Sequence, residues 1–234
     1  MRLLAPFRAL RPPPALAPSI AAQPYDVVSS SEARALAAGN PKSFFRISRP
    51  EVDLPPEVDE HADVVHARGR DNLAEFRQRG WLVLDEAPCF SLYRQRMDGH
   101  VQTGLVACAS VDAYLRGNIK KHELTRPDKE DDRTRHIDAL GANDEPVFLA
   151  YRAQPSVDAI LRRSTGRTAD VHFRSDDGVE HTVWVLPPSE NAAIESALSE
   201  VERLYIADGH HRSAAAARVE ALRRRRGEVD GEAG

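Results

Sequence analysis

Near its C-terminal end the chain reads Leu204-Tyr205-Ile206-Ala207-Asp208-Gly209-His210-His211-Arg212-Ser213-Ala214-Ala215-Ala216-Ala217, a short apolar run followed by a glycine and an alanine-rich run. The apolar run predicts a short buried strand over 204–207. Alanine is the residue most favourable to helix, so the second run predicts a helix from about His210 to Arg225. The stretch therefore predicts a strand that turns through Gly209 directly into a helix.

Apolar and alternating runs predict the remaining secondary structure. Asp98-Gly99 and Asp176-Asp177-Gly178 each join two such runs and indicate β-hairpins, and Ser29 with Glu32 has the spacing of a capping box. The strands predicted besides 204–207 are 44–48, 81–84, 90–97, 103–109, 146–151, 170–174 and 181–186. The helices predicted besides 210–225 are 30–38, 62–79, 111–115, 129–140 and 190–201.

These elements predict an α+β fold in which a mixed sheet with hairpins is flanked by helices. The proline-rich stretch 11–18 is expected to be a surface crossing or loop, because proline removes a backbone donor and fixes φ. We expect residues 1–234 to form a single domain, with a sub-boundary near 141–146.

Composition excludes several classes of protein. The 234 residues are 29% charged, and no apolar run approaches the roughly 18 residues of a membrane helix, so neither a signal peptide nor a membrane span is expected. Cys89 and Cys108 are too few for a disulfide scaffold and are expected to be reduced thiols in a cytoplasmic protein. A net charge of -4 argues against a protein that coats a polyanion.

The turn from Asp208 to Arg212 is the first candidate site. The start of a helix presents free N–H groups and the positive end of the helix dipole, which together favour an anion. His210, His211 and Arg212 would add donors, and the planar guanidinium of Arg212 suits phosphate oxygens. The alternative is that Asp208 only caps the helix and that the histidines are solvated.

The second candidate is the segment Lys120-Lys121-His122-Glu123-Leu124-Thr125-Arg126. It combines cations with a carboxylate, and phosphoryl transfer needs cations for the developing charge and a base for the hydroxyl proton. The alternative is a solvated run of charges balanced by the acidic residues that follow, which are Asp128, Glu130, Asp131 and Asp132.

Weaker candidates lie elsewhere in the chain. Asp26, in Pro24-Tyr25-Asp26-Val27-Val28, is an acid in a locally apolar stretch and is more typical of a turn. His172 and His181 lie on opposite arms of a predicted hairpin and could face each other, as a structural pair rather than a metal site. The sequence contains no P-loop, dinucleotide glycine fingerprint, zinc spacing or nucleophile elbow, and no metal ligands are predicted.

Several motifs, spread over nearly the whole chain, together resemble the bacterial and archaeal family called domain of unknown function 1015. Members of that family are expected to be longer than this chain, so the resemblance implies a C-terminally truncated or split member, which could be inactive alone. The motifs are Pro6-Phe7-Arg8-Ala9-Leu10, Pro24-Tyr25-Asp26-Val27, Asn40-Pro41 with Ser43-Phe44, Lys121-His122-Glu123 with Thr125, and Ile206-Ala207-Asp208-Gly209-His210-His211-Arg212.

The last of these motifs separately resembles the phosphate-handling turn of the ParB and sulfiredoxin superfamily, which includes a nucleotide-dependent serine kinase. The resemblance implies phosphoryl transfer from ATP or ADP, with Mg²⁺, to a small hydroxylated metabolite such as serine or phosphoserine. Asp208, Gly209, His210, His211 and Arg212 would then form the nucleotide site. The catalytic residues would be Glu123 as the base, with Lys121 and His122 stabilising the transferred group.

A second hypothesis is a nucleotide-sensing or nucleic-acid-binding regulator similar to the partition proteins of that superfamily. The run Arg223 to Arg226 favours it, although a basic run at the C-terminal end of a helix also suits the helix dipole. No helix-turn-helix pattern follows the run. The leading hypothesis therefore has a metabolite and a nucleotide as partners, and neither nucleic acid nor a membrane. The two hypotheses differ on whether the chain is an enzyme.

Overall fold

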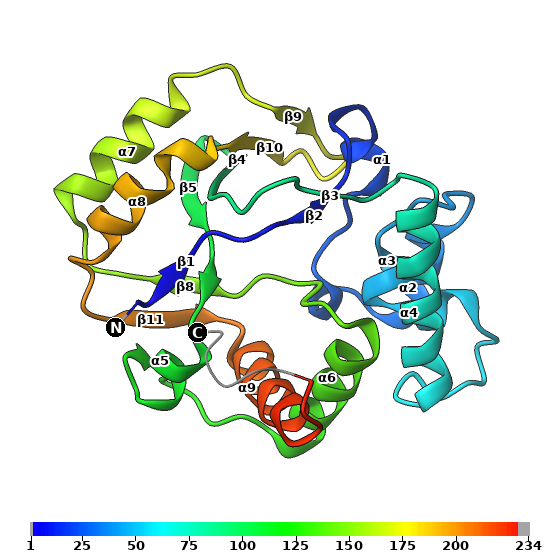
Figure 1. Ribbon diagram of the computed structural model, residues 1–234. Helices are drawn as coiled ribbons and strands as arrows, with labels where there is room; N and C mark the ends of the chain where they lie inside the picture. Colours follow the sequence, from blue (N-terminus) through cyan, green and yellow to red (C-terminus); the bar gives the residue numbers. More distant parts are fainter. Residues whose placement is uncertain (1, 229–234) are drawn as a thin grey trace. The chain divides into compact units, whose positions relative to one another are not determined.

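The computed structural model describes residues 2–228 and has the α+β fold that the sequence predicts (Figure 1). The chain divides into two compact units, and each unit is built from three separate segments. Of the points where the chain passes between units, the one after Ala150 lies nearest to the expected sub-boundary at 141–146. Among the described residues, unit 1 comprises 2–18, 82–118 and 151–204, and unit 2 comprises 19–81, 119–150 and 205–228.

Unit 1 is built on a four-stranded antiparallel sheet of strand order β5-β4-β10-β9. Both predicted hairpins are present: the turn at Asp98-Gly99 joins β4 to β5, and the turn at 175–179 joins β9 to β10. Two short antiparallel pairs, β1 with β6 and β2 with β3, add to the unit. The strands are β1 (Leu4–Ala5), β2 (Leu10–Arg11), β3 (Val83–Leu84), β4 (Ser91–Met97), β5 (His100–Val106), β6 (Cys108–Ala109), β9 (Val171–Arg174) and β10 (Glu180–Val185).

Three helices complete unit 1: α5 (Val111–Leu115), α7 (Pro155–Thr165) and α8 (Asn191–Leu198). Helices α7 and α8 contact each other (Figure 1). The apolar side chains of the sheet and of α8 are shielded from water, which is the main stabilising contribution to such a core. The buried residues include Phe90, Leu92, Trp184, Leu186 and Ile194.

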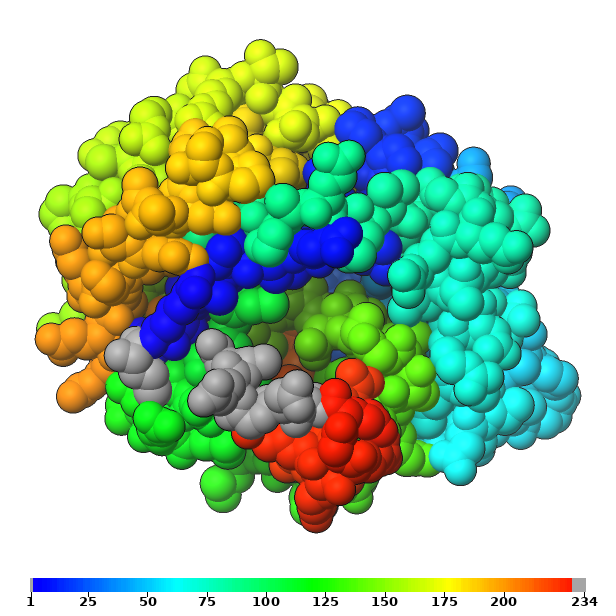
Figure 2. All heavy atoms as spheres, in the orientation of Figure 1, coloured from blue at the N-terminus to red at the C-terminus, as the bar shows by residue number. Residues whose placement is uncertain are grey.

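Unit 2 combines helices with a small sheet of order β7-β11-β8, in which β11 and β8 are antiparallel. Ile137 of α6 packs with Ala215 and Val219 of α9 in one buried cluster. The surfaces of α6 and α9 adjoin in Figure 2, where α9 is orange to red and α6 is light green. The elements are α2 (Ser30–Ala37), α3 (Phe45–Ser48), α4 (Asp63–Gln78), β7 (Ile119–Lys120), α6 (Pro127–Leu140), β8 (Phe148–Ala150), β11 (Leu204–Asp208) and α9 (His210–Arg225).

The segment 44–48 was expected to be a strand, and this expectation is wrong because residues 45–48 form the short helix α3. Tertiary contacts decide the outcome. The Arg46 side chain pairs with Asp53, and the Asn72 amide donates a hydrogen bond to the Arg46 carbonyl oxygen at 2.6 Å. These contacts come from η3 (Pro50–Asp53) and α4, and no strand of the described chain pairs with residues 45–48. The backbone N–H and C=O groups of this segment are therefore satisfied in a helix.

Other expectations need smaller corrections. Helix α7 was not predicted, and the proline-rich stretch contains a 3₁₀ turn, η1 (Pro14–Leu16), followed by α1 (Ala17–Ile20), where a loop was expected. His172 and His181 do not face each other, because His181 is opposite Phe173 in the β9–β10 register and His172 is opposite Thr182. Successive side chains alternate between the faces of a sheet, so the two histidines lie on opposite faces.

Candidate functional site

The N-terminal end of α9 lies in unit 2, directly after β11, as the glycine turn predicts. Gly209 precedes the helix with a φ of 95°, a left-handed conformation that favours glycine. A Cβ atom at this position would lie 2.8 Å from Cγ1 of Val147. Glycine is therefore required here both by the backbone conformation and by the close approach of the segment that precedes β8.

His210 is the most buried of the predicted site residues that can ionise, with a side chain only 5% exposed. Its Nε2 accepts a long hydrogen bond of 3.5 Å from the backbone N–H of His122, and the two rings meet edge to face at 4.4 Å. Because Nε2 is the acceptor, the ring proton lies on Nδ1, which is 3.7 Å from Oε2 of Glu123. Burial, and then the neighbouring His122, lowers the pKa of His210.

His211 makes a second contact with the same loop. Its Nε2 accepts a hydrogen bond of 3.0 Å from the backbone N–H of Arg126. The two consecutive histidines therefore hold the loop 121–126 against the start of α9. The two candidate segments, about 85 residues apart in the sequence, are brought together through side chains of one segment and backbone N–H groups of the other.

Lys121, His122 and Glu123 lie on this loop and are accessible to solvent. The side chains of His122 and Glu123 are 59% and 62% exposed, and His122 Nε2 lies 3.8 Å from Glu123 Oε1. Glu123 thus has one carboxylate oxygen toward His122 and the other toward His210. An exposed carboxylate beside a helix start is free to approach a ligand that binds there.

Arg212 has partners that its sequence context did not reveal. Its guanidinium donates to the backbone carbonyl of Pro146, pairs with the carboxylate of Asp208, and lies 3.7 Å from a carboxylate oxygen of Asp26. The side chain is only 11% exposed. Arg212 therefore ties three segments of unit 2 together, and Asp26, weighed above as a turn residue, is one of its partners.

Glu145 was not singled out from the sequence, although it belongs to the acidic pair Asp144-Glu145 directly before a predicted strand. Its Oε1 accepts a hydrogen bond of 2.9 Å from the backbone N–H of Tyr25. Burial, and then the neighbouring carboxylate of Asp144, raises the pKa of Glu145 to about 7. Such a pKa allows a carboxyl group to exchange a proton near neutral pH.

Buried charges continue from Glu145 into α6. The Arg133 guanidinium lies 4.3 Å from the centroid of the Tyr25 ring and pairs with Asp132 at 2.8 Å. Asp144 pairs with Nε2 of His136 at 3.1 Å. Neither the sequence spacing nor a local motif predicts these contacts, because each partner is unremarkable in its own segment.

Residues 4–234 match the model of the family described as "Protein of unknown function (DUF1015)". The chain belongs to this family. Neither the comparison with curated proteins nor the comparison with solved structures returned a match. The description of the DUF1015 family assigns no reaction, so the chemistry of this member has to be argued from its own residues.

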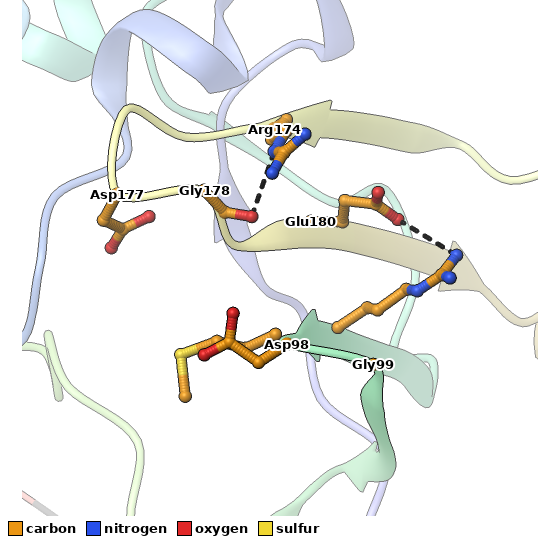
Figure 3. Close-up of a pocket in the computed structure, with 8 residues that line it drawn as sticks. Asp98, Gly99, Arg174, Asp177, Gly178 and Glu180 are labelled. Atoms are coloured by element: carbon orange, nitrogen blue, oxygen red, sulfur yellow. Dashed lines mark hydrogen bonds and ion pairs between the residues drawn. The ribbon is translucent and has the colours of Figure 1, made fainter.

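A pocket of about 370 Å³ lies in unit 1 of this DUF1015 protein, where the two hairpin turns end (Figure 3). Arg174 donates to the carbonyl of Gly178 at 3.0 Å, and Arg96 lies 3.8 Å from Glu180. None of the residues predicted as a site lines it. The lining residues are Arg96, Met97, Asp98, Gly99, Arg174, Asp177, Gly178 and Glu180.

Residues 2–228 of this DUF1015 chain contain neither a metal-binding cluster nor a membrane-spanning helix. No group of three or more histidine, cysteine, aspartate or glutamate side chains there could hold a metal ion. Among the same residues, no helix is both long and apolar enough to cross a bilayer.

Proposed function

We propose that the protein catalyses nucleotide-dependent phosphoryl transfer to a small hydroxylated metabolite and holds the phosphates at the start of α9. The observation that carries the proposal is the form of this helix start. No side chain caps it, and the first intrahelical hydrogen bond runs from Ser213 N–H to the Gly209 carbonyl. The N–H groups of the three preceding residues are therefore suited to phosphate oxygens, and the helix dipole favours the negative charge.

The loop 121–126 would supply the reacting groups. Glu123 would take the proton of the substrate hydroxyl while the hydroxyl oxygen forms a bond to the terminal phosphorus. The bond between that phosphorus and the bridging oxygen breaks, and the shortened nucleotide leaves with the electron pair. Lys121 and His122 would stabilise the charge on the transferred group.

The remaining residues would act mainly through their backbone. The Nε2 atoms of His210 and His211 hold the loop in place, so these residues would offer their N–H groups to the ligand. Arg212 would add positive charge beside the helix start while Pro146 keeps its guanidinium oriented. The nucleotide would be ATP or ADP, and we assign no residue of the described chain to Mg²⁺.

The likeness of the Asp208 to Arg212 turn to the ParB and sulfiredoxin superfamily supports the same proposal. The alternative of a nucleic-acid-binding regulator is less favoured, because much of the basic run in α9 is paired within unit 2. Arg223 and Arg226 contact Asp138, and Arg224 pairs with Glu220. We expect no sequence-selective DNA binding at about 0.15 M salt, and a nucleotide-dependent complex in an anisotropy assay would instead favour the regulator.

A thermal-shift titration with ATP, ADP and phosphoserine tests the proposal, because a ligand that binds only the native state raises its melting temperature. The informative variant is Ser213→Asp. A carboxylate in the first turn of α9 interacts favourably with the helix dipole, so the helix is retained, but it repels a bound phosphate. Ser31→Asp, in the first turn of α2, is the matched control. We expect ligand protection to be lost in Ser213→Asp alone. Equal protection in the two variants, or none in the wild type, would contradict the phosphate site.

A further inference from the structure

Three segments of unit 2 form a closed ring of polar contacts next to the start of α9. Glu145 accepts from Tyr25 N–H at 2.9 Å, and the next residue along, Asp26, lies 3.7 Å from Arg212. Arg212 in turn donates to the carbonyl of Pro146, which follows Glu145 in the chain. Each segment therefore contacts the other two, and the charge on Glu145 is part of the ring.

The ring adjoins the helix start itself. A Cβ atom at Gly209 would clash with Val147, and the carbonyl of Pro146 accepts a hydrogen bond from the side chain of Arg212 in the first turn of α9. Residues 145–147 thus run alongside the N-terminal end of α9. Glu145 directly precedes these two contacts in the chain, and its pKa responds to the charge of Arg212 in the first turn of α9.

The balance of charge in the ring is unfavourable to an anion. Among the described side chains of these three segments that contact one another, Arg212 is the cation and Asp26, Asp208 and Glu145 are the carboxylates, and Asp144 adds its charge beside Glu145. Asp26 and Asp208 are exposed and can be screened by water, whereas Glu145 is more buried. Glu145 is therefore the carboxylate whose charge is most costly when a phosphate arrives.

The groups facing Glu145 determine how it titrates. Burial and Asp144 raise its pKa to about 7, the Tyr25 N–H and Arg212 lower it, and Asp26 raises it. Further out, Arg133 of α6 lies over the Tyr25 ring, and His136 of α6 pairs with Asp144. At neutral pH the group is thus poised between its two charge states.

We propose that Glu145 takes up a proton when a phosphate-class dianion binds at the start of α9, so that anion affinity at this site is regulated by pH. The inference rests on the phosphate site proposed above. The proton comes from solvent and neutralises one of the three carboxylates, which leaves Arg212 with less competition for the anion.

The direction of the pH dependence follows from linkage. The bound anion stabilises the protonated form of Glu145, so the complex holds more protons than the free protein above about pH 7. Anion affinity therefore falls as the pH rises through this range, by up to about tenfold per pH unit when one proton is taken up.

Calorimetric titration with sulfate tests the inference, because sulfate has the charge of a phosphate dianion but does not itself titrate near neutrality. Proton uptake is obtained from the binding heats in two buffers of different ionisation enthalpy. Glu145→Gln retains a carbonyl acceptor for Tyr25 N–H but cannot titrate, and Glu57→Gln removes an exposed carboxylate elsewhere in unit 2 as the matched control.

We expect the wild type and Glu57→Gln to take up a proton near pH 7, and Glu145→Gln to bind sulfate more tightly at about pH 8 with little uptake. Equal uptake in all three would assign the proton to a group other than Glu145 and overturn the inference while leaving the phosphate site. No sulfate binding by any variant would overturn both. If Glu145→Gln does not fold, carbon NMR of the wild-type glutamate carboxyls serves instead, and sulfate must raise the pKa of the one that titrates near 7.

Discussion

The sheet of unit 1 and the helix start of unit 2 are stabilised by different kinds of contact. Within a hairpin turn of the sheet, polar partners are close in sequence, as in the bonds from Arg174 to Gly178 and from Ser175 to Asp177, and the longer-range pair of Arg96 with Glu180 is exposed. At the start of α9, Arg212 contacts Pro146, 66 residues away, in addition to the nearby Asp208, and Glu145 binds the backbone of Tyr25, 120 residues away. The helix start therefore depends on contacts from three separate segments of unit 2, and one of its neighbours, Glu145, has a pKa near neutrality.

The largest expected effect is a difference in stability between alanine substitutions at two glycines, Gly209 and Gly99, which both have a left-handed backbone conformation. Gly209→Ala should destabilise the protein by about 2–4 kcal/mol, because left-handed strain adds to the clash with Val147. Gly99→Ala in the β4–β5 turn has a φ of 82° but no described atom within 4 Å of the new Cβ, so strain alone should cost about 1 kcal/mol. Urea unfolding measures both, and equal losses would show that the approach of Val147 does not matter.

The second effect concerns His66, a buried residue of α4 whose ring nitrogens form no hydrogen bond with any described residue. Burial lowers its pKa to about 4, with Asp132 acting in the opposite direction. Between about pH 6.5 and 4 the unfolded chain binds more protons than the native one, so stability falls as the pH is lowered, by about 2–3 kcal/mol.

The variant His66→Leu should flatten this dependence, and His100→Leu, at an exposed position of β5, is the matched control. Unfolding free energies measured at several pH values between these limits provide the comparison. A wild-type slope that survives in His66→Leu would assign the acid sensitivity to other groups.

The sequence predicts features that depend on neighbouring residues better than features that depend on contacts between distant segments. The hairpin at Asp98-Gly99, the capping box at Ser29 and the start of α9 were predicted correctly, because turn and cap chemistry is local. The helix over 45–48 was mistaken for a strand because Asp53 and Asn72 decide its conformation.

The candidate site divides in the same way. The segments around Glu123 and His210 could be proposed separately from their residue types, whereas the contacts that bring them together are seen only in the structure. Glu145 could not be found, because its importance depends on the backbone of Tyr25 and on burial. Neither property is visible in the residues that surround it in the sequence.

A smaller effect is expected for Glu145→Gln on stability. The pKa of Glu145 is raised to about 7, so the native chain binds more protons than the unfolded one between about pH 4.5 and 7, and ionisation weakens the fold as the pH rises. The variant should be more stable than the wild type at pH 8, because it cannot ionise, and nearly as stable as the wild type at pH 4.5. The gain at pH 8 should be only about 1–2 kcal/mol, since the side chain of Glu145 is only partly shielded from water. Thermal unfolding at the two pH values tests this, and a variant that is less stable at pH 8 would contradict it.

The smallest effects compare two ion pairs of nearly equal length. Arg212 lies 3.7 Å from Asp26 in unit 2, and Arg96 lies 3.8 Å from Glu180 in unit 1, but their arginine side chains are 11% and 58% exposed. Asp26→Asn should cost about 1 kcal/mol, because it removes a carboxylate from a guanidinium that is largely shielded from water. Glu180→Gln should cost only a few tenths of a kcal/mol, since solvent screens an exposed pair. Salt provides a second measurement: about 0.5 M salt should erase the small loss in Glu180→Gln and leave part of the loss in Asp26→Asn, because Arg212 is shielded although Asp26 itself is 44% exposed. If salt removes both losses equally, the contacts around Arg212 are no more protected from solvent than those of the hairpin turns.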